Sequence, residues 1–327
     1  MRLRLWMAVF LMLLVFNPAY AGQGGVHVAV KFSGLTHALN DPDPAVRVAA
    51  ARNLGNMKEK SAVPALMAML VKDNDEGARL AALGALAVIA DRQALPAYLQ
   101  ALKDEDARIR QSAADAMSGL WDEKGKGALL NAMLKDPSPD VRRSAALALG
   151  APGDTGRQEA DGAVGNQDVE GALVQVLMND KSYEVRAAAA SVLGRIKGKN
   201  SLGPLLDAMS KDKNASVRAA AVKAVGKFQD NEAVEPLIKV LYFEKDENVI
   251  VNDIKALRYS SDPRIADPLV AKLDSASDRV LWQAIDLIER IKPPEAVDKL
   301  KSISEDNYES EGVREKAKEA IELMGGD

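Results

Sequence analysis

Few residues of this chain have side chains that could act as a catalytic nucleophile or bind a metal ion. The sequence has no cysteine and only two histidines, His27 and His37, which lie close together near its start. The missing thiols exclude disulfides, zinc-thiolate sites and cysteine nucleophiles. Neither histidine is followed by the glutamate of a helical metal pair, and no phosphate-binding G-x-x-x-x-G-K-[ST] motif occurs. The sequence therefore predicts no catalytic residue, no metal site and no cofactor.

The residue that does recur at fixed spacing is an arginine within a short apolar phrase. "EVRAAAASVLGRI" (184–196) returns as "SVRAAAVKAVGKF" (216–228), and "DVRRSAALALGAP" (140–152) precedes both. We number this arginine position 0; its equivalents are Arg47, Arg79, Arg110, Arg142, Arg186, Arg218, Ile250, Leu281 and Arg314. The intervals are 31 to 33 residues, except for one of 44. Such a period indicates a repeat architecture.

Each repeat reads as two helices. Four residues before position 0 stands a residue whose side chain can cap a helix: Asp43, Asp75, Asp106, Ser138, Ser182, Asn214, Asp246, Ser277 and Ser310. Positions +3, +4 and +7 are mostly small and apolar, which predicts a buried helical face. About 14 residues earlier, segments such as "AVPALMAML" (62–70) place a proline in the first turn of another helix. Only 4% of the residues are aromatic, so we expect a helical core of Ala, Leu, Val and Met.

The first 21 residues differ from the repeats. Arg2 and Arg4 precede an apolar run from Leu5 to Phe16, and Ala19-Tyr20-Ala21 follows. This pattern is typical of a secretory signal peptide that is cleaved after Ala21, and the alternative is an uncleaved anchor or a buried helix. We expect a periplasmic or secreted protein without a membrane span, whose formal net charge changes from −4 to −6 when the leader is lost. That charge gives no overall attraction to nucleic acid.

The repeat resembles the HEAT-repeat family, in particular the bacterial HEAT-like type named after phycobilisome lyases. The resemblance rests on the D-x-x-V-R-x-x-A-A-x-x-L-G phrase and on the proline of the first helix. It implies an all-α fold, an α-solenoid (superhelix) of about nine helical hairpins between residues 27 and 325. It also implies that the arginines pair with acidic residues of an adjacent repeat. We therefore interpret Arg47, Arg79, Arg110, Arg142, Arg186, Arg218 and Arg314 as a structural ladder.

The longest interval contains an insertion, "GAPGDTGRQEADGAVGNQD" (150–168). We divide the chain into the leader (1–21), repeats 1–4 (22–150), the insertion (151–167) and repeats 5–9 (168–327). Asp154, Glu159 and Asp161 could make the insertion a calcium-binding or partner-binding loop. Without the spacing of a calcium loop, a flexible solvated segment is the simpler interpretation.

Two further departures from the repeat lie near its end. Asp253 occupies position +3, where the other repeats have alanine, and Trp282 follows the position-0 residue Leu281. Trp282 either is exposed for binding or covers a gap between repeats 8 and 9. A Trp and an Asp on a concave basic surface also serve HEAT-like DNA glycosylases, but the export signal and the acidic charge argue against this for Trp282 and Asp286.

The residues at +1, +5 and +9 lie off the buried face of the second helix of each repeat. In repeats 1–4 they are mixed, whereas in repeats 5–7 they turn basic. A strip results, and its residues are Arg195, Lys223, Lys227, Lys255, Tyr259, Trp282 and Asp286. It could bind an acidic protein segment, or it could be an ordinary solvated face.

We therefore expect an exported, monomeric scaffold or adaptor that binds another protein on its concave surface and does not catalyse a reaction. The alternative is a HEAT-type lyase, modifying enzyme or enzyme subunit whose site the motifs do not reveal.

Overall fold

The computed structural model describes residues 33–151 and 167–325. The predicted leader, the start of the first repeat, and Asp154, Glu159 and Asp161 of the insertion lie outside these ranges. Contacts divide the described residues into two units. The first contains 33–132 and 136–148, and the second contains 133–135, 149–151 and 167–325.

The described residues form nine helical hairpins and no strand, so the predicted all-α solenoid is confirmed. The first helix of each hairpin is its A helix: residues 33–38, α4 (Val63–Lys72), α6 (Leu95–Ala101), α8 (Glu123–Lys135), α11 (Gln167–Asn179), α13 (Leu202–Lys211), α15 (Val234–Phe243), α17 (Ala266–Ala271) and α19 (Val297–Glu305). The second is its B helix: α3 (Pro44–Asn56), α5 (Glu76–Ile89), α7 (Ala107–Ala116), α9 (Pro139–Leu149), α12 (Tyr183–Ile196), α14 (Ala215–Val225), α16 (Glu247–Leu257), α18 (Asp278–Ile291) and α20 (Glu311–Met324).

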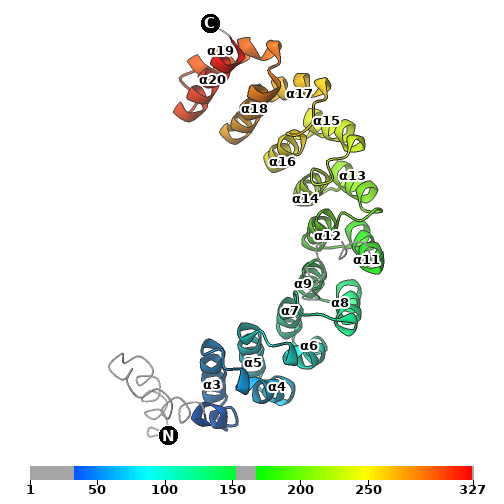
Figure 1. Cartoon of the computed structure of the whole chain (residues 1–327), viewed down its shortest axis with the longest axis vertical. Coiled ribbons are helices and arrows are strands. Elements are labelled where there is room, and N and C mark those ends of the chain that lie inside the picture. The colour runs from blue at the N-terminus through cyan, green and yellow to red at the C-terminus, as the bar shows by residue number, and fades with distance from the viewer. Residues whose placement is uncertain (1–32, 152–166, 326–327) are drawn as a thin grey trace, which may run out of the picture. The chain divides into compact units, whose positions relative to one another are not determined.

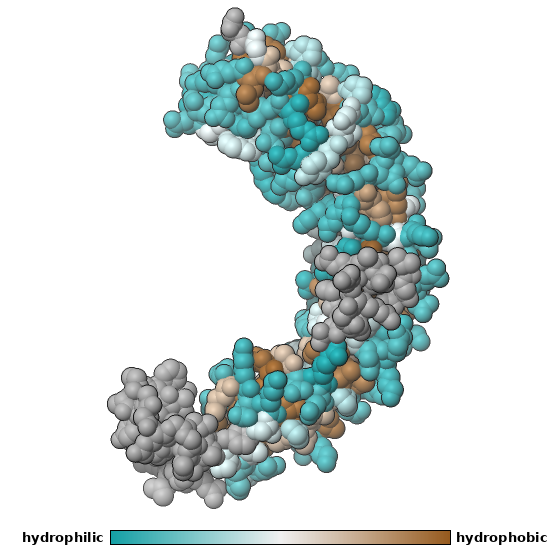
Figure 2. Space-filling model, viewed as in Figure 1, coloured by the Kyte–Doolittle hydropathy of each residue, from teal (hydrophilic) through white to brown (hydrophobic). Residues whose placement is uncertain are grey.

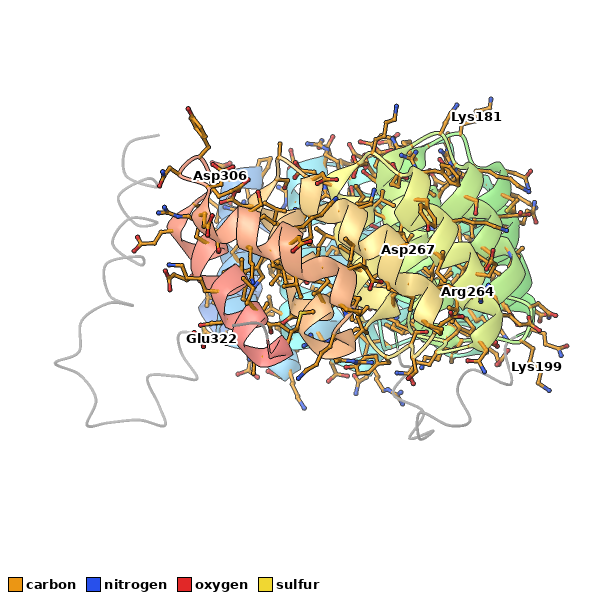
Figure 3. All side chains as sticks on the ribbon, turned by 90° about the horizontal axis from the view of Figure 1, so that it is seen from above. Lys181, Lys199, Arg264, Asp267, Asp306 and Glu322 are labelled. Atoms are coloured by element: carbon orange, nitrogen blue, oxygen red, sulfur yellow. The ribbon has the colours of Figure 1, made fainter. Side chains whose placement is uncertain are left out.

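Within each unit the A helices form one layer and the B helices form another (Figure 1). In the second unit, the turns that join A to B lie at one edge, where Figure 3 shows Lys181 and Asp306. The opposite edge carries Lys199, which follows α12, and Glu322 at the end of α20 (Figure 3). The core lies between the two layers and consists of the apolar residues at the repeating positions. On the face shown in Figure 2, mainly hydrophilic residues cover the described part of the chain.

Side-chain caps fix where most B helices begin. The side-chain oxygen of Asp75 accepts a hydrogen bond from the backbone amide of Ala78, and Ser182 does the same for Val185. Asp43, Asp106, Asn214, Asp246 and Ser310 also cap their helices in this way. Such a bond satisfies an amide that has no partner inside the helix. Ser277 occupies the predicted N-cap position of α18, but its side chain makes no cap bond.

Glycines allow neighbouring B helices to approach closely in the second unit. A Cβ atom added to Gly194 of α12 would lie 2.4 Å from Cβ of Ala224 in α14. A Cβ atom added to Gly226, which directly follows α14, would lie 2.6 Å from Cβ of Ala256 in α16. Only glycine leaves room for this packing, so the small residues of the repeat set the distance between hairpins.

The ranges that the structure describes contain no helix that is long and apolar enough to cross a membrane.

Candidate functional site

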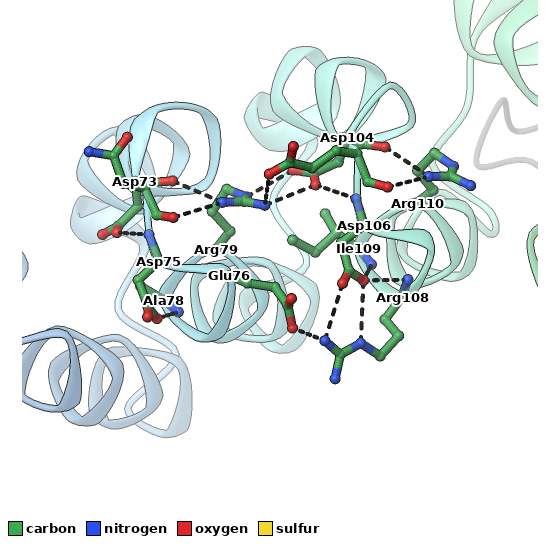
Figure 4. A network of polar contacts seen from close by, with 12 residues as sticks. Asp73, Asp75, Glu76, Ala78, Arg79, Asp104, Asp106, Arg108, Ile109 and Arg110 are labelled. Atoms are coloured by element: carbon green, nitrogen blue, oxygen red, sulfur yellow. Dashed lines mark hydrogen bonds and ion pairs between the residues drawn. The ribbon is translucent and has the colours of Figure 1, made fainter.

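The repeated arginines link each hairpin to the next. Arg79 donates through Nε and Nη2 to the two carboxylate oxygens of Asp104, at 2.9 and 3.0 Å, in the A–B turn of the following hairpin (Figure 4). Its Nη1 donates to the backbone carbonyls of Asp73 and Asn74, at 3.1 and 3.4 Å, in the turn of its own hairpin. One planar guanidinium thus holds its own turn and the next one, which a lysine could not do.

The same two-pronged contact recurs in both units. The pairs are Arg47–Asp73, Arg79–Asp104, Arg110–Asp136, Arg186–Asp212 and Arg218–Glu244. Both side chains of each pair are at most one fifth exposed. The hydrogen bond from Arg47 lowers the pKa of Asp73, because it stabilises the charged carboxylate. These cations are committed to packing, so they do not form a binding surface.

Of the two remaining arginines of the predicted ladder, Arg142 keeps the contact with its own turn and Arg314 differs. Arg142 donates through Nη1 to the backbone carbonyls of Asp136 and Pro137, at 2.9 and 3.2 Å, as its equivalents do in their own turns. Arg314 lies in the last hairpin and donates instead to Oδ1 of Asn307, at 3.3 Å. In hairpins 7 and 8, position 0 is taken by Ile250 and Leu281, which are both buried.

Three cations of the predicted strip come together on the B helices of hairpins 5 and 6. Arg195 belongs to α12, Lys223 belongs to α14, Lys227 follows α14, and all three are exposed. Partial desolvation and the nearby charges of Lys223, Arg195 and Lys197 lower the pKa of Lys227. Among the described residues, none of these four cations makes an ion pair. The result is a cluster of uncompensated positive charge.

Sequence reasoning did not include Lys197 in this cluster. It follows α12 with a left-handed backbone, φ 53°, at position +11. Lys58, Ala90, Gln229 and Lys292 have positive φ at the same position of their hairpins. These positions hold Lys, Ala or Gln, so no shared residue type in the sequence marks the turn that places Lys197 beside the B-helix face.

The aromatic end of the predicted strip is arranged differently. Tyr259 is 70% exposed, and the guanidinium carbon of Arg290 lies 5.8 Å from the centre of its ring. Lys255 is exposed on α16 and makes no ion pair with another described residue. The Oδ2 atom of Asp286 lies 3.4 Å from Nη2 of Arg258. Its charge is therefore largely balanced by its neighbour.

Trp282 leans against the last hairpin. The Nζ atom of Lys316 lies 5.9 Å from the centre of its ring, and a Cβ atom on Gly312 would lie 3.7 Å from its Cζ3 atom. The side chain is still 43% exposed. Both interpretations of Trp282 therefore hold in part. It packs against α20, between hairpins 8 and 9, and it also presents part of its side chain to solvent.

In the first unit the same positions are mixed: they hold Val48, Leu80 and Val88, but also Arg52, Gln111 and Asp115. One shallow pocket lies between α3 and α5 and another between α5 and α7, and Leu80 and Gly84 of α5 line both. Val88, at position +9, is 48% exposed. The basic character of the B-helix face therefore belongs to the second unit.

Within residues 33–151 and 167–325, no three acidic or histidine side chains come close enough together to hold a metal ion. The arrangement of side chains there offers charge and exposed aromatic rings, which are suited to binding.

Comparison with known proteins identifies the repeats. The family model described as HEAT repeats matches residues 32–118, 95–161 and 170–250. The structure of YibA from Escherichia coli is similar with a TM-score of 0.57 and 20% identity, over 84% of this chain and 96% of YibA. Yeast importin-β (Kap95p) is similar with a TM-score of 0.64 and 17% identity, over 90% of this chain and 46% of importin-β. Kap121p bound to Nup53p gives a TM-score of 0.58 and 16% identity, over 89% of this chain and 37% of Kap121p.

These structural similarities concern the fold alone, since all three identities are at or below 20%. The chain spans about the full length of YibA but less than half of importin-β or Kap121p. No match was found among curated proteins.

Proposed function

Because this chain belongs to the HEAT-repeat family, we propose that it acts as a scaffold or adaptor that binds an acidic segment of another protein. The binding surface is the B-helix face of hairpins 5–7, and we name Arg195, Lys197, Lys223, Lys227 and Lys255 the cationic strip. The proposed function is binding alone and involves no catalysis, metal ion or cofactor.

The observation that carries the proposal is the uncompensated charge of the cationic strip. Several exposed cations elsewhere in the second unit have an acidic neighbour, such as Asp207 for Lys211 and Glu235 for Arg264. The cations of the strip instead lie beside one another, and their mutual repulsion helps to lower the pKa of Lys227. Carboxylates of a bound segment would relieve that repulsion, which favours association and makes it sensitive to salt.

The ends of the strip suit a protein ligand. Tyr259 presents an exposed ring beside Arg290, and both residue types are enriched among the residues that contribute most to binding at interfaces. The same fold holds a protein in the Kap121p structure, which is described as bound to Nup53p. A protein segment therefore accounts for both the charge and the aromatic surface.

The test uses the full chain without its leader and a fluorescein-labelled peptide of alternating Glu and Gly residues. We expect the double variant Lys223→Glu/Lys227→Glu to weaken peptide binding at least about 10-fold, because it reverses the centre of the strip. The matched control is Lys181→Glu/Lys213→Glu, which makes the same charge change in two A–B turns. Both control lysines are exposed, and neither pairs with another described residue.

Binding that falls equally in both variants would show attraction to net charge alone, and binding that is unchanged in both would place the site elsewhere. A single-stranded oligonucleotide that binds more tightly than the peptide would overturn the choice of a protein partner.

We also propose that the protein is exported and cleaved after Ala21, on the pattern of residues 1–21. Mass spectrometry of the protein from its native host should then find Gly22 at the amino terminus. An intact Met1 in the cytoplasmic fraction would contradict this.

A further inference from the structure

The contact between hairpins 7 and 8, which we call the α16–α18 joint, lacks the arginine pair of earlier joints. Position 0 of hairpin 7 is Ile250, which is 7% exposed. The position that holds Asp212 or Glu244 in the two preceding turns is taken by Ser275, whose hydroxyl accepts a hydrogen bond only from the amide of Ser277 in its own turn. Both partners of the ladder pair have been replaced together, so no ion pair ties α16 to the next turn at this place.

The joint also lacks the close approach of glycine and alanine. The preceding joints place Gly194 against Ala224 and Gly226 against Ala256. The equivalent residue of hairpin 7 is Arg258, which reaches Asp286 at 3.4 Å and is 54% exposed. An exposed ion pair contributes little to stability compared with tight packing of small residues.

A buried carboxyl group lies in the helix that forms this joint. Asp253 of α16 is 0% exposed, and neither of its carboxylate oxygens has a hydrogen-bond partner among the described residues. The other eight hairpins have alanine at this position: Ala50, Ala82, Ala113, Ala145, Ala189, Ala221, Ala284 and Ala317. All eight of these alanines are buried. Asp253 thus places a carboxyl group where the other hairpins bury only the methyl group of an alanine.

The surroundings of Asp253 favour its protonated form. Burial raises its pKa well above the ordinary value, because a carboxylate loses the solvation of water there. Lys272, in the short helix η6 (Lys272–Asp274) that follows α17, opposes this shift, whereas Glu244 at the end of α15 adds to it. Glu244 is itself paired with Arg218 of α14. From α18, two charged groups reach across the joint: Asp286 pairs with Arg258, and Arg279 donates through Nη1 to Oδ1 of Asn248 in α16, at 2.7 Å.

We propose that the α16–α18 joint is a proton-controlled hinge, which stays packed while Asp253 carries a proton and opens when Asp253 ionises. In the packed state an ionised Asp253 would be left without water and without a partner, and such a group is strongly destabilising. Opening the joint returns the carboxylate to water. No ladder pair and no glycine–alanine contact holds α16 to α18. This joint therefore opens more easily than the α12–α14 and α14–α16 contacts, which have both. The inference does not depend on the ligand proposed for the cationic strip.

The sign of the pH dependence follows from the raised pKa. Packing of the joint is fully favourable below the ordinary carboxyl pKa, and it weakens as the pH rises through the raised pKa of Asp253. The hinge therefore opens on the alkaline side, opposite to the acid loss expected for the ladder carboxylates.

Hydrogen exchange measured by mass spectrometry on the full chain tests the hinge. Protection factors, corrected for the intrinsic pH dependence of exchange, are followed for peptides of α16 and α18 between about pH 5 and pH 9. We expect these peptides of the wild-type protein to lose protection at least about 10-fold as the pH rises, while peptides of α12 and α14 change little.

Two variants remove the ionisable group. Asp253→Ala restores the residue of the other hairpins, and Asp253→Asn keeps the shape of the side chain. In both, the pH dependence of α16 and α18 should disappear, and protection at alkaline pH should exceed that of the wild type in Asp253→Ala. Asp207→Asn, an exposed carboxylate on α13, is the matched control and should behave as the wild type.

A loss of protection that persists unchanged in either variant would overturn the hinge, because another group would then control it. Faster exchange of Asp253→Ala at every pH would also overturn it, since Asp253 would then stabilise the joint.

Discussion

Arg186 and Asp212 join hairpins 5 and 6 through two parallel contacts. The Nε atom of Arg186 lies 2.7 Å from Oδ2 of Asp212, and its Nη2 atom lies 2.9 Å from Oδ1. Asp212 also accepts a hydrogen bond from the backbone amide of Asn214, so the carboxylate orders its own turn while it binds the preceding helix. The side chains are only 8% and 10% exposed, which protects the pair from water and salt.

Removal of this arginine should destabilise the second unit. Arg186→Ala leaves a nearly buried carboxylate unpaired and releases the carbonyls of Asp180 and Lys181, so we expect the free energy of unfolding to fall by about 3 kcal/mol. Arg186→Lys should retain only part of this stabilisation, because an ammonium group lacks the planar guanidinium that contacts both carboxylate oxygens at once. Urea denaturation gives the comparison. Arg195→Ala, an exposed cation on the same helix, should cost less than about 1 kcal/mol. Equal effects of the two alanine variants would contradict the structural role of Arg186.

The ladder should also weaken in acid. Burial raises the pKa of Glu244, but hydrogen bonds from Arg218 and from the amides of Asp246 and Lys245 outweigh it and bring the pKa to about 2. Since this value lies below the ordinary one, the stabilisation is present above the ordinary carboxyl pKa and is lost as the pH falls through about 2. The free energy of unfolding should therefore decrease between about pH 5 and pH 2.

Glu244→Gln should lower stability at neutral pH and make that acid decrease smaller, because the variant has no carboxylate to protonate. Denaturation curves at several pH values measure both effects. An unchanged slope in Glu244→Gln would assign the acid sensitivity to other carboxylates, such as Asp212.

Two glycines of the second unit should respond in opposite ways to alanine. In Gly194→Ala the new methyl group would lie 2.6 Å from Cα of Ala224, so we expect a loss of about 1–3 kcal/mol. Gly171, inside α11, has nothing within 4 Å of an added Cβ atom. Gly171→Ala should therefore stabilise the helix by about 0.5–1 kcal/mol. Thermal unfolding of both variants checks the pair, and a shift of the melting temperature in the same direction for both would contradict the close approach of α12 and α14.

Trp282 should contribute to the packing of the last hairpin. More than half of its surface is covered, partly by Gly312 and Lys316, so Trp282→Ala should lower the free energy of unfolding by about 1–2 kcal/mol. Tyr308, which is 100% exposed, is the control, and Tyr308→Ala should leave stability within about 0.5 kcal/mol of the wild type. A melting temperature unaffected by Trp282→Ala would contradict this packing role and favour the interpretation that Trp282 is exposed for binding.

The repeating signals of the sequence are local, and this is why they predicted so much of the fold. An N-cap such as Asp75 acts on an amide three residues away, and a proline such as Pro64 affects only the first turn of its helix. Ser277 shows the limit of such reasoning, since a residue suitable for a cap can begin a helix without making the bond.

The sequence by itself determined the period, the hairpins and the positions of the repeated arginines, because each hairpin repeats the same short-range interactions. Only the tertiary structure decided which side chains meet between hairpins. It placed Lys197 in the cationic strip, paired Asp286 with Arg258, and buried Asp253 without a partner. The physical reason is that charge and burial depend on side chains about one repeat away along the chain, whose distance is fixed by how closely neighbouring helices pack and by no local pattern.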